Sequence, residues 1–363
     1  MTSIDAEPHF ARLDSLTGLR FFAAFAVLLR HTVPEIFPLP VLTELSAIGP
    51  VGVGFFFVLS GFILTWTWKP TTARSQFYLR RAVRILPLHV LTTIMAAALL
   101  IIANTPLWVS TILSLFLLQA WLTDKYRLGG NSPSWSLSVE AFFYLLFPLI
   151  VQPLARLTVR KSWAVIFSAG TLMIFWHMFY LVAGKLQLSF VSALSGYTNP
   201  LYRLGEFVIG VALASAMRRG WRPKFSMPAA LAVALFGYCA IALMNAMIKY
   251  FAAFSLPLSV LDLLFLPVTV VLITSAVSSD LRGRMSPMRN PVIVRLGEWS
   301  FALYLIQSLV ITGAVRLFAY GTISWESGLV AIGVIVISVG LSGAFFHWFE
   351  KPAEGWLRSK LAS

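Results

Sequence analysis

The sequence predicts an all-α fold: a polytopic integral membrane helix bundle of about ten transmembrane helices plus one short re-entrant or interfacial segment. Of its 363 residues, 58% are hydrophobic and only 12% are charged, and the mean hydropathy is +0.82. A soluble domain averages roughly 45–50% apolar and about 25% charged residues. So many apolar side chains cannot be hidden from water in a globular core, which excludes a soluble enzyme and a disordered chain.

Eleven apolar segments follow one another along the chain and are separated by short polar connectors. A spanning helix needs about 20 residues to cross roughly 30 Å of hydrocarbon. The segment 107–122 is short by this measure, and the connector before it has only a few residues. The segments run approximately over 15–33, 49–68, 83–103, 107–122, 135–155, 162–182, 199–217, 227–247, 254–277, 295–318 and 326–349.

Basic residues gather in these connectors, and 28 Lys and Arg against 14 Asp and Glu give a net charge of +14. In a soluble protein this charge would suggest nucleic-acid binding, but basic connectors between apolar segments are typical of membrane orientation, with the positive side in the cytoplasm. The clusters share one side only if one of the third to fifth segments fails to cross. They are Arg74, Arg80, Arg81 and Arg84; Arg156, Arg160 and Lys161; Arg218, Arg219, Arg222 and Lys224; and Arg282, Arg284 and Arg289.

This orientation places both termini in the cytoplasm. We expect a cytoplasmic N-terminal tail over residues 1–14, one membrane domain over 15–350 and a cytoplasmic C-terminal tail over 351–363. No repeat of fixed period and no hydrophilic second domain interrupts the series.

The first apolar segment carries two ionisable residues, Arg20 and His31, eleven positions apart. Eleven residues at 100° each return to within about 20° of the start, so both side chains lie on one stripe of the helix, roughly 16 Å apart along its axis. Both could simply anchor the helix ends in the headgroup layers. Alternatively, a neutral imidazole at this depth could remove the proton from a hydroxyl as a general base.

Three arginines, Arg80, Arg81 and Arg84, enter the third segment at i,i+3 and i,i+4 spacing and therefore crowd one side of a helix start. A purely topological cluster would need no such phasing, and lysine would serve it equally well. Arginine is favoured where phosphates are held by two parallel hydrogen bonds. The cluster is therefore either a positive-inside anchor or a docking site for a phosphate-rich donor such as acyl-CoA.

A further carboxylate, Glu140, follows the helix start Ser132-Pro133 and shares a face with Ser136 at i,i+4. Because AFFYLLFPLIV comes next, this carboxylate enters the apolar layer, where it must pair, protonate or line a polar cavity. It is either a structural partner for an arginine or part of a reaction centre.

Other ionisable residues of the apolar segments favour structural roles. Arg203 and Glu206 are at i,i+3 and can satisfy each other, and Glu298 could meet Arg295 in the same way. No grouping of His, Cys and carboxylate residues has the spacing of a metal site, and no Walker loop is present.

Taken together, these motifs resemble the acyltransferase 3 family of bacterial integral-membrane O-acyltransferases of carbohydrates, over about residues 15–355. LTGLRFFAAFAVLLRH resembles its first-helix motif, GVGFFFVLSGFILT its second-helix signature, and YLRRAVRILP its arginine cluster. SWSLSVEAFFYLLFP resembles a Trp-Ser-Leu-x-x-Glu block, and LGEWSFALYLIQ and WFEKP resemble late-helix and C-terminal signatures. The residues that carry the resemblance are Arg20, His31, Phe56, Ser60, Gly61, Arg80, Arg81, Arg84, Trp135, Ser136 and Glu140.

The resemblance implies transfer of an acyl group, acetyl in the commonest case, from cytoplasmic acyl-CoA to a hydroxyl of a cell-envelope or exported carbohydrate, at the bacterial inner membrane. The partners implied are the bilayer, the acyl-CoA donor co-substrate and a carbohydrate or lipid-linked glycan acceptor, with no permanently bound cofactor and no nucleic acid. His31 would act as general base, aligned by Arg20 or Glu140. The arginine cluster would hold the donor. Substrate binding or structural support would come from Ser60, Trp135, Ser136, Arg203 and Glu206.

Two positions depart from the family pattern. Where many members have two acids and a glutamine, this chain has Glu140-Ala141-Phe142, and where many end the late-helix signature in histidine it has Gln307. A glycan or small-molecule transporter or flippase is the main alternative, because intramembrane Arg, Glu and His also suit a substrate pathway. A non-catalytic membrane scaffold is the second.

Overall fold

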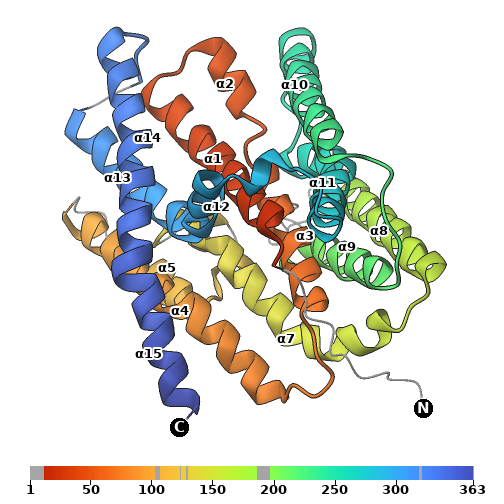
Figure 1. Ribbon diagram of the computed structural model, residues 1–363. Coiled ribbons are helices and arrows are strands. Elements are labelled where there is room, and N and C mark those ends of the chain that lie inside the picture. The colour runs from red at the N-terminus through yellow and green to blue at the C-terminus, as the bar shows by residue number, and fades with distance from the viewer. Residues whose placement is uncertain are drawn as a thin grey trace, which may run out of the picture.

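The computed structural model describes residues 12–102, 107–122, 124–127, 130–185, 197–318 and 321–362, and every regular element in these ranges is a helix (Figure 1). The predicted all-α membrane bundle is therefore confirmed. Of the predicted N-terminal tail over 1–14, residues 1–11 lie outside the described ranges.

Within the described residues, ten helical stretches are long and apolar enough to cross a membrane. A short helix, α2 (Pro40–Ser46), forms the beginning of the second stretch, Pro40–Trp66. The long helices are α1 (Asp14–Ile36), α3 (Val51–Trp66), α4 (Arg74–Ile102), α7 (Trp135–Ala155), α8 (Val159–Lys185), α9 (Pro200–Arg218), α10 (Met227–Ala252), α11 (Leu258–Leu281), α13 (Ser300–Phe318) and α14 (Trp325–Phe345).

The segment 107–122 is the one that falls short of a spanning length. It forms α5 (Trp108–Leu115), of only 8 residues, and a 3-10 turn at Gln119–Trp121. The backbone at Leu117 has a φ of 58°, a left-handed conformation that ends a right-handed helix. A four-residue helix, α6 (Asp124–Arg127), follows.

Two element boundaries differ from the sequence expectation. Helix α4 begins at Arg74 and not at residue 83. The prediction counted only the apolar segment, whereas the polar turns before it are helical as well. The predicted segment 295–318 is split at Trp299 into α12 (Pro291–Glu298) and α13. Helix α12 crosses α1 closely: a Cβ at Gly297 would lie 1.8 Å from the Thr17 carbonyl oxygen.

Helices α3 and α9 lie in the two most deeply buried spans among the described residues, and they touch backbone to backbone. A Cβ built at Gly61 would lie 2.1 Å from the Phe207 carbonyl oxygen, and one at Gly210 would lie 1.9 Å from the Val58 carbonyl oxygen. In lipid, helices associate through such close packing and not through hydrophobic burial, so small residues mark their contacts. Glycine at these two positions therefore fixes the distance between α3 and α9.

The start of α1 is fixed by a residue of α11. Asp280 accepts hydrogen bonds from the Ser15 backbone amide, at 2.9 Å, and from the Ser15 hydroxyl, at 2.6 Å. A carboxylate at a helix N-terminus satisfies a free amide and interacts favourably with the helix dipole. This contact ties α1 to the connector that follows α11.

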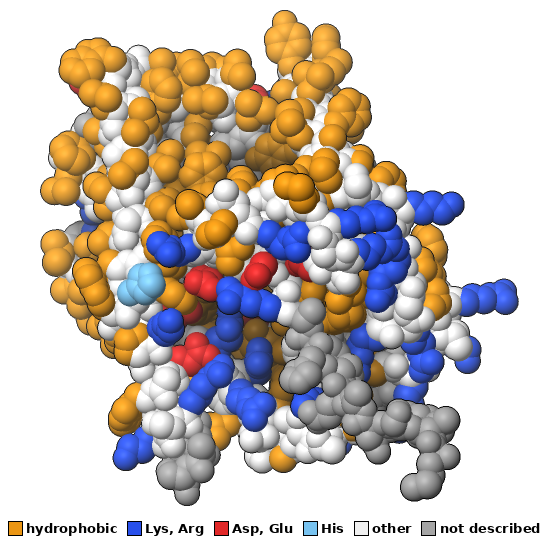
Figure 2. Space-filling view, in the orientation of Figure 1, with side chains coloured by type: hydrophobic (Ala, Val, Ile, Leu, Met, Phe, Trp, Pro, Cys, Tyr) orange, Lys and Arg blue, Asp and Glu red, His pale blue; other side chains and the backbone are white. Residues whose placement is uncertain are grey.

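Hydrogen bonds also bring the basic connectors together on one face of the bundle. The Arg218 guanidinium donates to the Thr65 carbonyl oxygen at 2.7 Å, and Arg219 donates to the Arg156 carbonyl oxygen at 3.1 Å. The connectors after α3, α7 and α9 are therefore neighbours. Figure 2 shows Lys and Arg side chains gathered over the lower half of the visible face, while its upper part is almost wholly hydrophobic.

Candidate functional site

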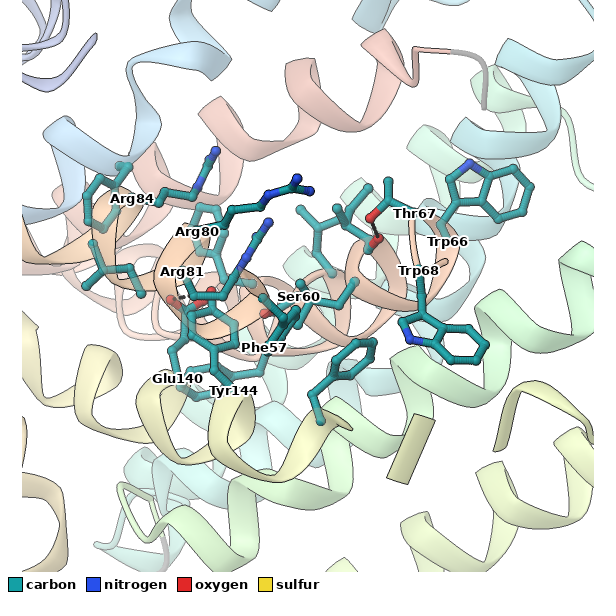
Figure 3. Close-up of a pocket in the computed structure, with 18 of the residues that line it drawn as sticks. Phe57, Ser60, Trp66, Thr67, Trp68, Arg80, Arg81, Arg84, Glu140 and Tyr144 are labelled. Atoms are coloured by element: carbon teal, nitrogen blue, oxygen red, sulfur yellow. Dashed lines mark hydrogen bonds between the residues drawn. The ribbon is translucent and has the colours of Figure 1, made fainter. Parts of the chain in front are cut away.

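A cavity of about 690 Å³ opens on the face that carries the basic connectors. Its walls come from the start of α1, most of α3 and the connector that follows it, the first turns of α4, much of α7 and the start of α13, with one side chain from α15 (Lys351–Ala362). The wall residues Ser60, Glu140 and Tyr144 face the α4 arginines across it (Figure 3). The cavity therefore lies between segments that are far apart in the sequence.

Positive charge dominates the lining. Among the described residues that line the cavity, eight are cationic and one, Glu140, is acidic. So many cations at one cavity repel one another, and a multiply charged anion would relieve that repulsion. The cationic residues are Arg12, Arg20, Lys69, Arg74, Arg80, Arg81, Arg84 and Arg358.

The arginines of α4 lie at different depths. Arg80 is exposed, while Arg81 and Arg84 are half-buried. The Arg81 Nε is buried with no hydrogen-bond partner among the described residues, and its guanidinium lies 5.9 Å from the centre of the Phe77 ring. A buried guanidinium donor without a partner costs free energy unless a ligand supplies an acceptor. The predicted arginine cluster thus points into the cavity.

Opposite these arginines, α7 presents Glu140 and Tyr144 on one face at i,i+4 spacing. The Tyr144 hydroxyl donates to Glu140 Oε2 at 3.3 Å, and the Ser60 hydroxyl of α3 lies within hydrogen-bonding reach of the same tyrosine. Ser136, one turn before Glu140, also lines the cavity and donates to the Pro133 carbonyl oxygen at 3.2 Å. Arg20 of α1 and Arg84 are close enough to act electrostatically on Glu140. The structure therefore brings together Arg20, the α4 arginines and the predicted carboxylate.

A second carboxylate, Glu350, belongs to this group and was missed by sequence reasoning. It lies in a π-helical turn, Phe346–Glu350, that joins α14 to α15, and its side chain is buried. Arg84 and Arg20 are its main electrostatic neighbours. A glutamate between an apolar segment and a basic tail, as in WFEKP, was the available signal. Glu140 on α7 and Glu350 in the π-helical turn thus both interact electrostatically with the two inner arginines, Arg20 and Arg84.

His31 does not share this cavity. Within the described residues, the α1 part of the lining ends at Arg20, and the next positions of the same stripe, Ala24 and Val27, are 0% and 3% exposed. The His31 imidazole follows them, half-buried, and its Nδ1 has no hydrogen-bond partner among those residues. Glu140 lies close to the arginines of the cavity and not beside His31. A packed layer therefore separates the predicted base from the arginine-lined cavity.

Arg203 and Glu206 form a separate buried cluster beside the cavity. Arg203 Nη1 lies 2.7 Å from Glu206 Oε1, and its Nη2 lies 2.6 Å from Asp262 Oδ2 on α11, with all three side chains at most 1% exposed. The rings of Tyr197, at 4.3 Å, and Trp135, at 5.8 Å, face the guanidinium. The predicted pair is present, and Asp262 completes it as a partner that the spacing could not reveal.

Three further findings concern polar groups. Glu298 pairs with Arg12, at 3.1 Å, where the i,i+3 spacing had suggested Arg295. Burial, with Asp262 nearby, raises the pKa of the Tyr197 phenol, which lies between the spanning helices α8 and α9. No group of three or more His, Cys, Asp and Glu side chains in the described part of the chain could hold a metal ion.

Comparisons with known proteins identify similar chains. The model of an acyltransferase domain family matches residues 13–347. The chain is 30% identical to "Acyltransferase MdmB" of Streptomyces mycarofaciens, over 95% of this chain and 92% of that protein. It is 25% identical to "Putative peptidoglycan O-acetyltransferase YrhL" of Bacillus subtilis, over 95% of this chain but only 55% of that protein. It is 27% identical to "Exopolysaccharide production protein ExoZ" of Rhizobium meliloti, over 73% and 77%. No solved structure matches.

Proposed function

This chain belongs to the acyltransferase 3 family and is a membrane-embedded acyltransferase, and on that basis we propose that it moves an acyl group, acetyl in the simplest case, from cytoplasmic acyl-CoA to a hydroxyl of a cell-envelope or exported carbohydrate. The names of similar proteins, a peptidoglycan O-acetyltransferase and an exopolysaccharide production protein, support a carbohydrate acceptor. The reaction forms an ester C–O bond and breaks the thioester C–S bond.

The observation that carries this proposal is the cationic cavity. CoA is a diphosphate with a further phosphate on its ribose, and arginines hold phosphate oxygens through paired hydrogen bonds. Arg81 offers a buried, unpartnered donor, and Arg84 lies one turn further inside. The positive-inside rule assigns the face with the basic connectors to the cytoplasm, where acyl-CoA is available. Both termini would then be cytoplasmic, in an inner membrane.

The proposed chemistry uses His31 as general base. Its neutral imidazole removes the acceptor hydroxyl proton, the oxygen attacks the thioester carbonyl, and the CoA thiolate leaves and takes up a proton. Arg20 and Glu140 would then act at the donor end of the cavity, since neither faces His31. Ala24 and Val27 lie between Arg20 and His31 and are fully packed. The thioester therefore reaches the imidazole only when the packing around these two residues opens.

A transfer assay with purified protein tests the proposal. Wild type in lipid nanodiscs is mixed with acetyl-CoA labelled in the acetyl group and with an envelope glycan extract, and label in the glycan is measured by mass spectrometry. We expect transfer by wild type, and loss of at least 100-fold for His31→Ala, the lower end of typical general-base effects. His347→Ala removes an exposed histidine outside the cavity and serves as the matched control.

Two results would contradict the proposal at different levels. If label stays on CoA with every glycan fraction, and the protein reconstituted into sealed proteoliposomes moves the glycan across the bilayer, the protein is a transporter. If the His31→Ala protein transfers acetyl groups as fast as the His347→Ala protein, the histidine is not the base, although CoA remains the donor.

A further inference from the structure

The C-terminal helix α15 continues the last membrane helix well past the bilayer. From Trp325 to Lys360 the helical stretch has 36 residues, including the π-helical turn. At 1.5 Å per residue it is about 54 Å long, whereas the hydrocarbon is roughly 30 Å thick. Its end therefore projects from the membrane, and Figure 1 shows α15 extending along the line of α14 on the same side as the start of α4.

This projecting helix packs against α4 and brings one cation to the cavity. Arg358 is among the residues that line the cavity, and it is close enough to Arg81 for their like charges to repel. Its side chain is 54% exposed, whereas Arg81 is half-buried and has an unpartnered Nε. Arg358 therefore lies at the rim of the cavity, outside the arginines of α4.

Three charged residues are regularly spaced from the end of the π-helical turn into α15. Glu350, Glu354 and Arg358 follow one another at four-residue intervals, which keeps them on one side of the helix. Glu350 faces the inner arginines, and Glu354 accepts a hydrogen bond from the Arg358 guanidinium. One side of the helix thus supports the inner arginines at its start and holds a cation over the rim about 12 Å further along.

We propose that Arg358 is a specificity-determining residue of the donor site, which binds the ribose 3′-phosphate of acyl-CoA. This inference rests on the proposed function. Because the thioester must enter the cavity, the nucleotide end of the donor stays at the opening. The diphosphate then reaches the inner arginines, and the 3′-phosphate, on the ribose, remains beside the rim. Arg358 lies beyond residues 13–347, which match the family model.

The test compares CoA with 3′-dephospho-CoA, which lacks only this phosphate. Binding of each is measured by calorimetric titration to full-length protein in nanodiscs of phosphatidylcholine, so that no anionic lipid headgroup competes for the arginine. Wild type should bind CoA about threefold to tenfold more tightly than dephospho-CoA, which is the range for a partly exposed charged contact. Arg358→Ala should lose that preference, because it should weaken the binding of CoA and leave the binding of dephospho-CoA unchanged. Arg160→Ala removes an exposed arginine outside the cavity and should keep the wild-type preference.

Each other outcome has a defined meaning. If Arg358→Ala keeps the wild-type preference, or if it weakens the binding of CoA and dephospho-CoA equally, the assignment of the 3′-phosphate to Arg358 is wrong. The same holds if wild type binds both ligands equally. If wild type binds neither, the proposed acyl-CoA donor itself is wrong. Arg358→Lys provides a check on folding, because it keeps the charge and should retain part of the preference.

Discussion

Replacing Gly210 by alanine tests whether the contact between α3 and α9 determines the geometry of the site. The new Cβ would lie 1.9 Å from the Val58 carbonyl oxygen and 2.8 Å from the Phe62 amide nitrogen. Ordinary contact begins near 3.4 Å, so the oxygen must move away by about 1.5 Å. Both neighbours are backbone atoms of a helix, so no single side chain can relieve the clash, and the two helices must separate.

The expected cost follows from this separation. Overpacking a dense interior costs about 1–3 kcal/mol, and we expect the upper end, about 3 kcal/mol, because two backbones must move. The cavity wall should move as well, since Phe57 and Ser60 lie on the α3 segment next to the contact. We therefore expect Gly210→Ala to lower both thermal stability and acetyl transfer.

The control is Gly333→Ala on α14. A Cβ there meets nothing within 4 Å, so this variant should be unchanged or more stable by up to about 1 kcal/mol, the difference in helix propensity between glycine and alanine. Thermal unfolding of both variants in nanodiscs, followed by tryptophan fluorescence, measures the difference. If Gly210→Ala unfolds at the same temperature as Gly333→Ala, the close crossing of α3 and α9 is not what sets their packing.

Three more predictions concern single side chains. Arg84→Ala should raise the KM for acetyl-CoA about tenfold or more. Arg84→Lys should raise it less, because lysine keeps the charge but loses the paired hydrogen bonds. Initial rates at varied acetyl-CoA concentration measure the KM of both variants. Arg203→Leu should lower the free energy of unfolding by about 3–5 kcal/mol, because it leaves two buried carboxylates without their cation; wild-type stability would contradict the ion cluster. Asp280→Ala should cost about 1 kcal/mol through loss of the bonds to Ser15, measured by thermal unfolding.

The sequence alone predicts much of the fold. Apolar segments of spanning length, separated by basic connectors, indicate a membrane helix bundle. The reason is that backbone N–H and C=O groups in lipid must form their hydrogen bonds within the chain, which a helix allows. Length alone distinguishes segment 107–122 from the others, and i,i+3 spacing pairs Arg203 with Glu206. The phasing of the α4 arginines predicts a phosphate site, because one helix face is fixed by periodicity before any tertiary contact forms.

Contacts between helices could not be predicted in the same way. The spanning helices are apolar on nearly every face, so their sequences do not determine which helices pack against each other. Asp262 reaches Arg203 from another helix. Near the end of the chain, Glu350 approaches Arg84 and Arg20, and Arg358 lines the cavity. Likewise, a shared stripe on α1 predicts that Arg20 and His31 point the same way, but not that Ala24 and Val27 between them are fully packed.

What the sequence determined, then, is the environment of the chain, the number of its spanning helices, and the faces of individual helices that carry charge. The tertiary structure alone decided which of those faces meet around one cavity. The physical reason is that periodicity acts within a helix, whereas the approach of two helices depends on the shapes of both, down to the absence of a single Cβ at Gly61 or Gly210.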